Sequence, residues 1–168
     1  DVRPAPAGKV PRFAGSVGFV PDRVRAEMLA LYRSGEIPIF LGAEGPKNVA
    51  QTAEIADGWL PLYYSPFRQE VYADQLAAAK EGFEVAAMAN ISVCDNVADG
   101  LLPVKMMLGF YIGGMGAKGK NFHTDLMARM GFEEEAFRIQ DLFFEGRRDE
   151  AVALVPDEFA DEISLVGP

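Results

Sequence analysis

The chain has 168 residues, of which 49% are hydrophobic and 24% charged, as expected for one globular domain and not for a chain disordered throughout. Its formal net charge of −9 excludes a general electrostatic attraction to nucleic acid or to an anionic membrane. One cysteine rules out an internal disulfide, and neither a membrane-spanning apolar run nor a signal-peptide pattern is present. We therefore expect a cytoplasmic protein.

Residues 1–24 differ in composition from the rest of the chain. They carry four prolines and three glycines and show little periodicity, which predicts an irregular leader, a linker or the frayed start of a truncated chain. A short helix is predicted over 22–32, where apolar side chains recur at helical spacing.

Strands and helices then alternate. Short apolar runs predict strands over 37–41, 59–63 and 83–94, and the segments between them predict helices over 46–56 and 66–80. The second of these helices is expected to turn Phe67, Val71 and Leu76 inward. Such an alternation with short connections is typical of βαβ units and a parallel sheet, so the fold class is α/β.

After Cys94 the pattern becomes helical. Helices are predicted over 101–111, 122–130, 133–145 and 149–155, and Asp157 is expected to cap a last short turn. We interpret these helices as an excursion between two strands, with no returning strand before the chain ends at 164–168.

The turn over residues 42–48, Gly-Ala-Glu-Gly-Pro-Lys-Asn, joins the first predicted strand to a helix. Glycines allow the backbone to come close to a ligand or to adopt a positive φ. Pro46 can start the helix without losing a hydrogen bond. The free N–H groups of the first helical turn and the charge of Lys47 favour an anion such as phosphate. A plain tight turn without a ligand is the alternative, because the spacing matches neither common phosphate-binding motif.

Four segments in the same order resemble the luciferase-like oxidoreductases, in the branch that uses the deazaflavin coenzyme F420. They read IPIFLGAEGPKNVAQTAEIADGWLPLYYSP, FEVAAMANISVCDNVADGLLPVK, YIGGMGAKGKNFHTDLMARMGFEEEAFRIQDLFFEGRRDEAV and VPDEFADEISLVGP. The resemblance covers about residues 26–168, and residues 1–24 lie outside it.

The resemblance implies a partial (β/α)8 TIM barrel over 25–168. This part would supply about strands five to seven with their helices, and the helical excursion before a missing last strand. It also implies that the cofactor phosphate is held by Gly42, Ala43, Gly45, Pro46 and Lys47. The catalytic groups are not identified, because the family places most of them in the first half of the barrel.

The implied function is hydride transfer between reduced F420 and a small organic substrate, in a full-length form that is a homo-oligomer. An FMN-dependent monooxygenase of the same superfamily is the nearest alternative. A truncated, non-catalytic fragment that acts through its helices is another, because an open parallel sheet exposes edges and an apolar face. A phosphosugar-binding barrel enzyme would use the same turn and would not bind flavins.

Single residues elsewhere suggest structural roles more than chemistry. His123, at a predicted helix start, is expected to be a capping or surface group, and one histidine with one cysteine cannot build a typical metal site. Trp59 is expected to pack and Cys94 to be a small buried hydrophobic residue. Asn90 and Ser92 are an exception: they alternate along a strand, so both could point into the barrel and bind a ring or a substrate.

For two further groups of residues, the sequence is compatible with a packing role and with a ligand-binding role. Tyr63 and Tyr64 lie at the end of a strand, where barrel side chains can reach a ligand. Gly113, Gly114 and Gly116, followed by two lysines, favour a helix stop and a solvated turn over a second binding loop.

Overall fold

The computed structural model describes residues 26–27, 30, 33–35 and 38–168. The chain divides into two units, Asp1–Pro38 and Ile39–Pro168, and the second unit contains every element described below. The leader predicted over 1–24 lies outside the described residues, as does most of the helix predicted over 22–32.

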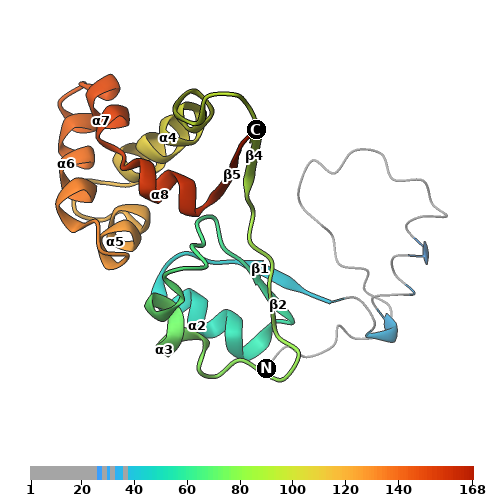
Figure 1. The fold of residues 1–168 in the computed structure, drawn as a ribbon. Coiled ribbons are helices and arrows are strands. Elements are labelled where there is room, and N and C mark those ends of the chain that lie inside the picture. The colour runs from blue at the N-terminus through green and yellow to red at the C-terminus, as the bar shows by residue number, and fades with distance from the viewer. Residues whose placement is uncertain (1–25, 28–29, 31–32, 36–37) are drawn as a thin grey trace. The chain divides into compact units, whose positions relative to one another are not determined.

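A parallel sheet forms the first part of the second unit (Figure 1). Strands β1 (Phe40–Gly42), β2 (Gly58–Leu60) and β3 (Glu84–Val85) lie in that order, and helix α2 (Pro46–Ile55) connects β1 to β2. Asp57 ties the start of β2 to β1, because its N–H donates to the Ile39 carbonyl at 2.8 Å and its carboxylate accepts from the Ile39 N–H at 2.7 Å. The predicted parallel βαβ arrangement is confirmed.

The helix predicted over 66–80 is much shorter in the structure. A 3-10 helix, η1 (Gln69–Tyr72), and α3 (Ala73–Leu76) replace it, and Phe67 is 74% exposed instead of facing inward. The chain leaves the helical conformation at Arg68 (φ −130°, ψ 37°), whose guanidinium is held by Glu162, while Ser65 Oγ accepts from the Phe67 N–H at 3.2 Å and donates to Glu162 at 2.7 Å. These bonds hold the first residues in a turn.

The long strand predicted over 83–94 is divided into two. Its first part is β3, and its last part, β4 (Asn90–Val93), pairs in parallel with β5 (Ser164–Gly167). The expectation that no strand returns before the chain ends was therefore wrong. A four-residue strand shows too little periodicity to be distinguished from a tail, whereas the structure fixes it through the β4 ladder.

Between β4 and β5 the chain is helical, as predicted (Figure 1). The helices are α4 (Val97–Gly114), α5 (Phe122–Arg129), α6 (Glu133–Phe144), α7 (Arg148–Leu154) and α8 (Asp157–Glu162). The expected cap at the last helix is corrected: the N-cap is Pro156, and the Asp157 carboxylate instead accepts from Lys105 Nζ at 2.6 Å. None of the helices in the described ranges is long and apolar enough to cross a membrane.

The glycines at the end of α4 serve helix packing. A Cβ added to Gly113 or Gly114 would lie 2.6 Å or 2.4 Å from the side chain of Phe143 on α6. Because no real Cβ approaches so closely, a side chain at Gly113 would push α4 away from α6, and one at Gly114 would displace the end of the Phe143 ring. The helix also stops here, at Gly114, as the sequence predicts.

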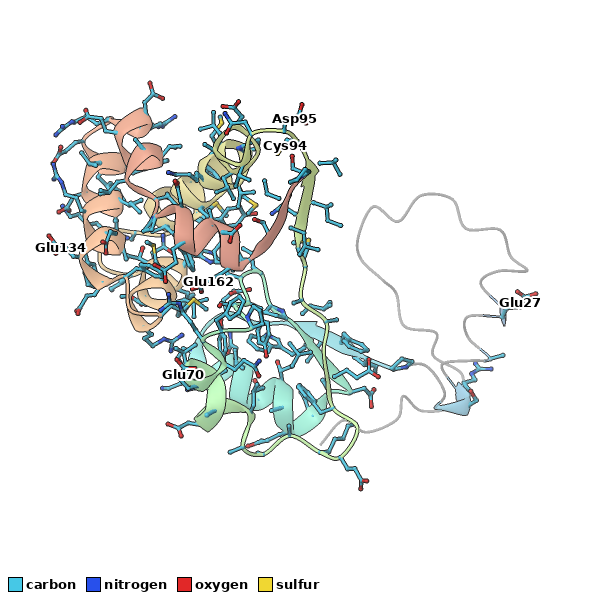
Figure 2. The ribbon with its side chains drawn as sticks, in the orientation of Figure 1. Glu27, Glu70, Cys94, Asp95, Glu134 and Glu162 are labelled. Atoms are coloured by element: carbon cyan, nitrogen blue, oxygen red, sulfur yellow. The ribbon has the colours of Figure 1, made fainter. Side chains whose placement is uncertain are left out.

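Arg68, after β2, links the sheet part of the unit to its helices. Its guanidinium donates to both carboxylate oxygens of Glu162 on α8, to Glu158 and to the Met130 carbonyl, all within 3.1 Å. It also lies 4.5 Å from the centre of the Phe132 ring. Figure 2 shows Glu162 on the side of α8 that faces the segment after β2.

Candidate functional site

The predicted turn joins β1 to α2 as expected. Gly42 ends β1, Gly45 is the N-cap of α2 with an extended backbone (φ −76°, ψ 146°), and Pro46 is the first helical residue. The turn lies at the carboxyl end of a parallel strand, which is where α/β proteins bind ligands.

The two glycines of the turn have different roles. Neither has a positive φ, so of the two properties that glycine permits here, a close backbone approach and a left-handed backbone, the second is not used. A Cβ on Gly45 would lie 3.0 Å from the ring of Phe122, so Gly45 packs closely against a ring that is itself 59% exposed. A Cβ on Gly42 would meet only the Leu60 carbonyl oxygen at 3.9 Å, so the exposed side of Gly42 is open to a ligand.

The start of α2 offers free donors and a positive charge. No side chain caps this helix, and its first backbone bond runs from the Val49 N–H to the Gly45 carbonyl at 3.0 Å. The N–H groups of Lys47 and Asn48 therefore have no acceptor within the helix. Lys47 is exposed and takes part in none of the ion pairs formed among the described residues. This donor set suits an anion.

Ala43 and Glu44 point into the protein. The Ala43 carbonyl accepts from Trp59 Nε1 at 2.8 Å, and Glu44 Oε1 accepts from the Leu62 N–H at 2.9 Å. Burial raises the pKa of Glu44, and the Leu62 bond offsets this in part. The structure thus brings Gly42, Pro46 and Lys47 to the exposed side of the turn and turns Ala43 and Gly45 inward.

Three aromatic rings, from Tyr63, Tyr111 and His123, meet next to the turn. The Tyr63 ring centre lies 6.0 Å from that of Tyr111 and 5.5 Å from that of His123, both edge to face. Tyr63 is 1% exposed, yet its Oη has no hydrogen-bond partner among the described residues, and neither has His123 Nδ1. Buried polar atoms without partners are rare and mark a position worth explaining.

Sequence reasoning did not place His123 here. It was expected as a capping or surface group, but the cap of α5 is Asn121, whose Oδ1 accepts from the His123 N–H at 2.9 Å. The His123 side chain is half-buried against Tyr63 and Tyr111. The capping asparagine signals the helix start, but no local pattern reveals which distant side chains that helix contacts.

Asn90 and Ser92 lie on the face of β4 that is turned toward α4, and because the described strands do not close a barrel, their position in a barrel interior stays a prediction. Asn90 Nδ2 lies 4.0 Å from Met107 Sδ on α4, and Ser92 Oγ would lie 3.5 Å from a Cβ on Gly100 of the same helix. The opposite face of β4 carries Ile91 and Val93, which are 73% and 85% exposed. The close approach of α4 through Gly100 fixes this register.

Two other expectations concern packing. Trp59 is fully buried, which confirms its packing role. Cys94 is half-buried rather than fully buried, and its Sγ would lie 2.5 Å from a Cβ on Gly100. The described residues contain no group of three or more histidine, cysteine, aspartate or glutamate side chains placed to hold a metal ion.

Because His123 is half-buried, we expect the folded protein to lose stability in acid. Burial lowers its pKa from 6.5, so the unfolded chain binds this proton at a higher pH than the folded protein does. The neutral imidazole of His123 therefore makes its full contribution to the free energy of unfolding above the pKa of the unfolded chain. This contribution falls as the pH drops below that pKa. Urea unfolding near pH 7.5 and near pH 5.5 should show a larger loss for the wild type than for His123→Phe.

His123 is the only histidine in the chain, so the comparison isolates one imidazole. Glu44, whose raised pKa acts with the opposite sign, is present in both proteins and cancels in the difference. Equal pH dependence of the two proteins would contradict this prediction.

The family follows from a comparison of the whole chain with known proteins. Residues 3–168 match the family model of the luciferase-like monooxygenases. The chain belongs to this family. The match includes most of residues 1–24, which we set apart as a leader. That the family domain begins at residue 25 therefore stays a prediction.

Several curated proteins are similar to this luciferase-like chain. A protein of Mycobacterium tuberculosis, named as a coenzyme F420-dependent oxidoreductase, is 43% identical over 141 residues, which cover 79% of this chain and 41% of that protein. The 5,10-methylenetetrahydromethanopterin reductase of Archaeoglobus fulgidus is 25% identical over 81% of this chain and 42% of its own length. That of Methanolobus tindarius is 31% identical over 49% of this chain and 28% of its own.

A solved structure shows the fold. The coenzyme F420-dependent tetrahydromethanopterin reductase of Methanopyrus kandleri superposes with a TM-score of 0.53 at 20% identity, over 81% of this chain and 47% of that one. The luciferase-like chain thus has part of a TIM-barrel fold, and its described strands do not close a barrel. It spans less than half the length of the first relatives it matches.

Proposed function

We propose that this chain is the part of a coenzyme F420-dependent oxidoreductase that binds the phosphate group of the cofactor. The observation that carries the proposal is the uncapped start of α2, with exposed Lys47, at the carboxyl end of β1. The names of the similar proteins from M. tuberculosis and M. kandleri support F420 as the cofactor.

The residues of the turn fit a phosphate group. The open side of Gly42 lets an oxyanion approach the backbone, and the N–H groups of Lys47 and Asn48 can donate to it. The Lys47 ammonium then adds a full positive charge in a chain that is otherwise strongly acidic. Ala43 and Gly45 act indirectly, because they set the backbone path of the turn from its buried side.

When bound, the deazaflavin ring would supply the hydride-transfer chemistry, and this chain would hold and orient the tail of the cofactor. The reacting substrate is proposed to be a small organic molecule, and the full-length form a cytoplasmic homo-oligomer. Catalytic groups are proposed to come from parts of the barrel outside this chain, because active sites of such barrels gather residues from several strands.

Replacing Lys47 with methionine tests the turn. The variant removes one charge-assisted hydrogen bond to the phosphate and keeps the apolar stem, so we expect F420 to bind about tenfold more weakly. The measurement is a titration of the purified chain followed by the fluorescence of the cofactor. Arg138→Met is the matched control, because it removes one positive charge from an exposed residue of α6.

Each result of this titration separates the alternatives. Stronger binding of FMN than of F420 would favour the monooxygenase alternative. Binding of neither cofactor by the wild type would overturn the proposal and favour a non-catalytic or phosphosugar-binding role. A substitution at Gly45 is unsuitable for this purpose, because a Cβ there disturbs the Phe122 ring whether or not a ligand binds.

A further inference from the structure

A carboxyl group lies inside the phosphate turn, the turn over residues 42–48. Glu44 is the residue before Gly45, the N-cap of α2, and three peptide units, at most about 11 Å, separate its Cα from that of Lys47. Glu44 Oε1 accepts from the Leu62 N–H at 2.9 Å. Because Leu62 follows β2, this bond holds the Glu44 side chain at the carboxyl ends of β1 and β2.

No cation pairs with this carboxyl group in the part of the chain that the structure describes. Neither Glu44 nor Lys47 takes part in the ion pairs formed there. Burial and, to a smaller extent, the charge of Glu44 raise the pKa of the neighbouring Tyr63 and Tyr72. Since Glu44 is half-buried, salt screens its charge less than that of an exposed residue, and its field reaches the exposed side of the turn.

A negative charge is an unexpected component of a turn whose other groups attract anions. The hydrogen bond from Leu62 does not require it, because the side-chain oxygen of a glutamine can accept from the same N–H. The charge of Glu44 instead opposes every anion that approaches Lys47. The repulsion energy is proportional to the charge of the anion, so two negative charges are repelled twice as strongly as one.

We propose that Glu44 is a specificity-determining residue, which shifts the preference of the turn toward phosphodiesters, with one negative charge, and away from phosphomonoesters, with up to two. The inference rests on the proposed function, because it concerns the same turn. Lys47 and the start of α2 attract both kinds of phosphate, and Glu44 weakens the binding of the doubly charged kind more. FMN ends in a phosphomonoester, so Glu44 acts against FMN at this turn.

Glu44→Gln tests this role in the purified chain, because it keeps the acceptor for Leu62 and removes the charge. The probes are dimethyl phosphate, with one negative charge, and methyl phosphate, with about two at pH 8. We expect dimethyl phosphate to bind about threefold more tightly to the variant than to the wild type. Methyl phosphate should gain the square of this factor, about tenfold, because its repulsion energy is twice as large. Titrations followed by the NMR signals of the backbone amides of the turn give the dissociation constants.

Glu54→Gln is the matched control. It removes the same charge from an exposed residue of the same helix, about 10 Å along the axis from Lys47, and should leave both dissociation constants unchanged. The unfolding temperature without ligand shows that the turn is intact: Glu44→Gln should unfold at the same temperature as the wild type or higher, because a half-buried charge without a cation partner is lost.

The outcomes distinguish this inference from the proposed function. Equal gains for the two phosphates in Glu44→Gln, no gain, or weaker binding would overturn the role of Glu44 and leave the phosphate turn in place. The same changes in Glu54→Gln would also overturn it, because they would show a general effect of net charge. A wild type whose turn responds to neither phosphate would overturn the proposed function and, with it, this inference.

Discussion

Replacing Trp59 with alanine is expected to lower the free energy of unfolding of the Ile39–Pro168 unit by about 3–5 kcal/mol. The side chain is fully buried, and its ring contacts those of Tyr72 and Tyr64 edge to face at 4.8 Å and 6.2 Å. Its loss leaves a large cavity and also leaves the Ala43 carbonyl without its partner. Urea unfolding followed by far-ultraviolet circular dichroism measures the effect, since Trp59 is the only tryptophan.

Trp59→Phe separates the two contributions. It keeps much of the ring volume and removes the Nε1 donor, so we expect a loss of about 1–3 kcal/mol from the unpaired carbonyl. The same variant should weaken cofactor binding, because the Ala43 carbonyl holds the turn in place. A Trp59→Ala protein as stable as the wild type would show that this side chain does not hold the turn.

The second large effect is expected at Arg68. Arg68→Met should cost about 2–3 kcal/mol, because among the described residues Glu162 then keeps only the Ser65 hydroxyl as a partner while its side chain is 11% exposed. The Met130 carbonyl loses its donor as well. Glu158→Gln is the control, because the Glu158 side chain is 68% exposed and its ion pair should contribute at most about 1 kcal/mol.

The measurement is the free energy of urea unfolding of the three proteins. Similar losses in Arg68→Met and Glu158→Gln would contradict the central role of the Arg68–Glu162 pair. A loss in Arg68→Met that Glu162→Gln restores in the double variant would support it, because the double variant no longer buries an unpaired charge.

The sequence predicts the elements that carry their own local signals. Pro46 marks the first residue of α2, and the helices after β4 follow from their apolar spacing and from the glycines that separate them. The position of the phosphate turn at the end of β1 follows from the same signals. Its anion-binding role stays a prediction that the titration of Lys47→Met addresses.

The remaining features depend on contacts between segments that are distant in the sequence. The helix after Ser65 is interrupted at Arg68, whose side chain is held by Glu162, and β5 exists because β4 pairs with it. Likewise, His123 gains its surroundings only when α5 packs against Tyr63, in the segment that follows β2. No local periodicity contains this information. In these segments, contacts with distant residues therefore override the local preference for helix or strand.

The contact between Gly45 and Phe122 constrains how relatives of this chain can change. A side chain at position 45 needs the space that the aromatic ring at 122 now fills. An added Cβ needs that ring to move by a few tenths of an ångström, for which Phe122 has room because it is 59% exposed. A bulky side chain at position 45 must displace the whole ring, so the size of the residue in the turn is coupled to the start of the helical excursion.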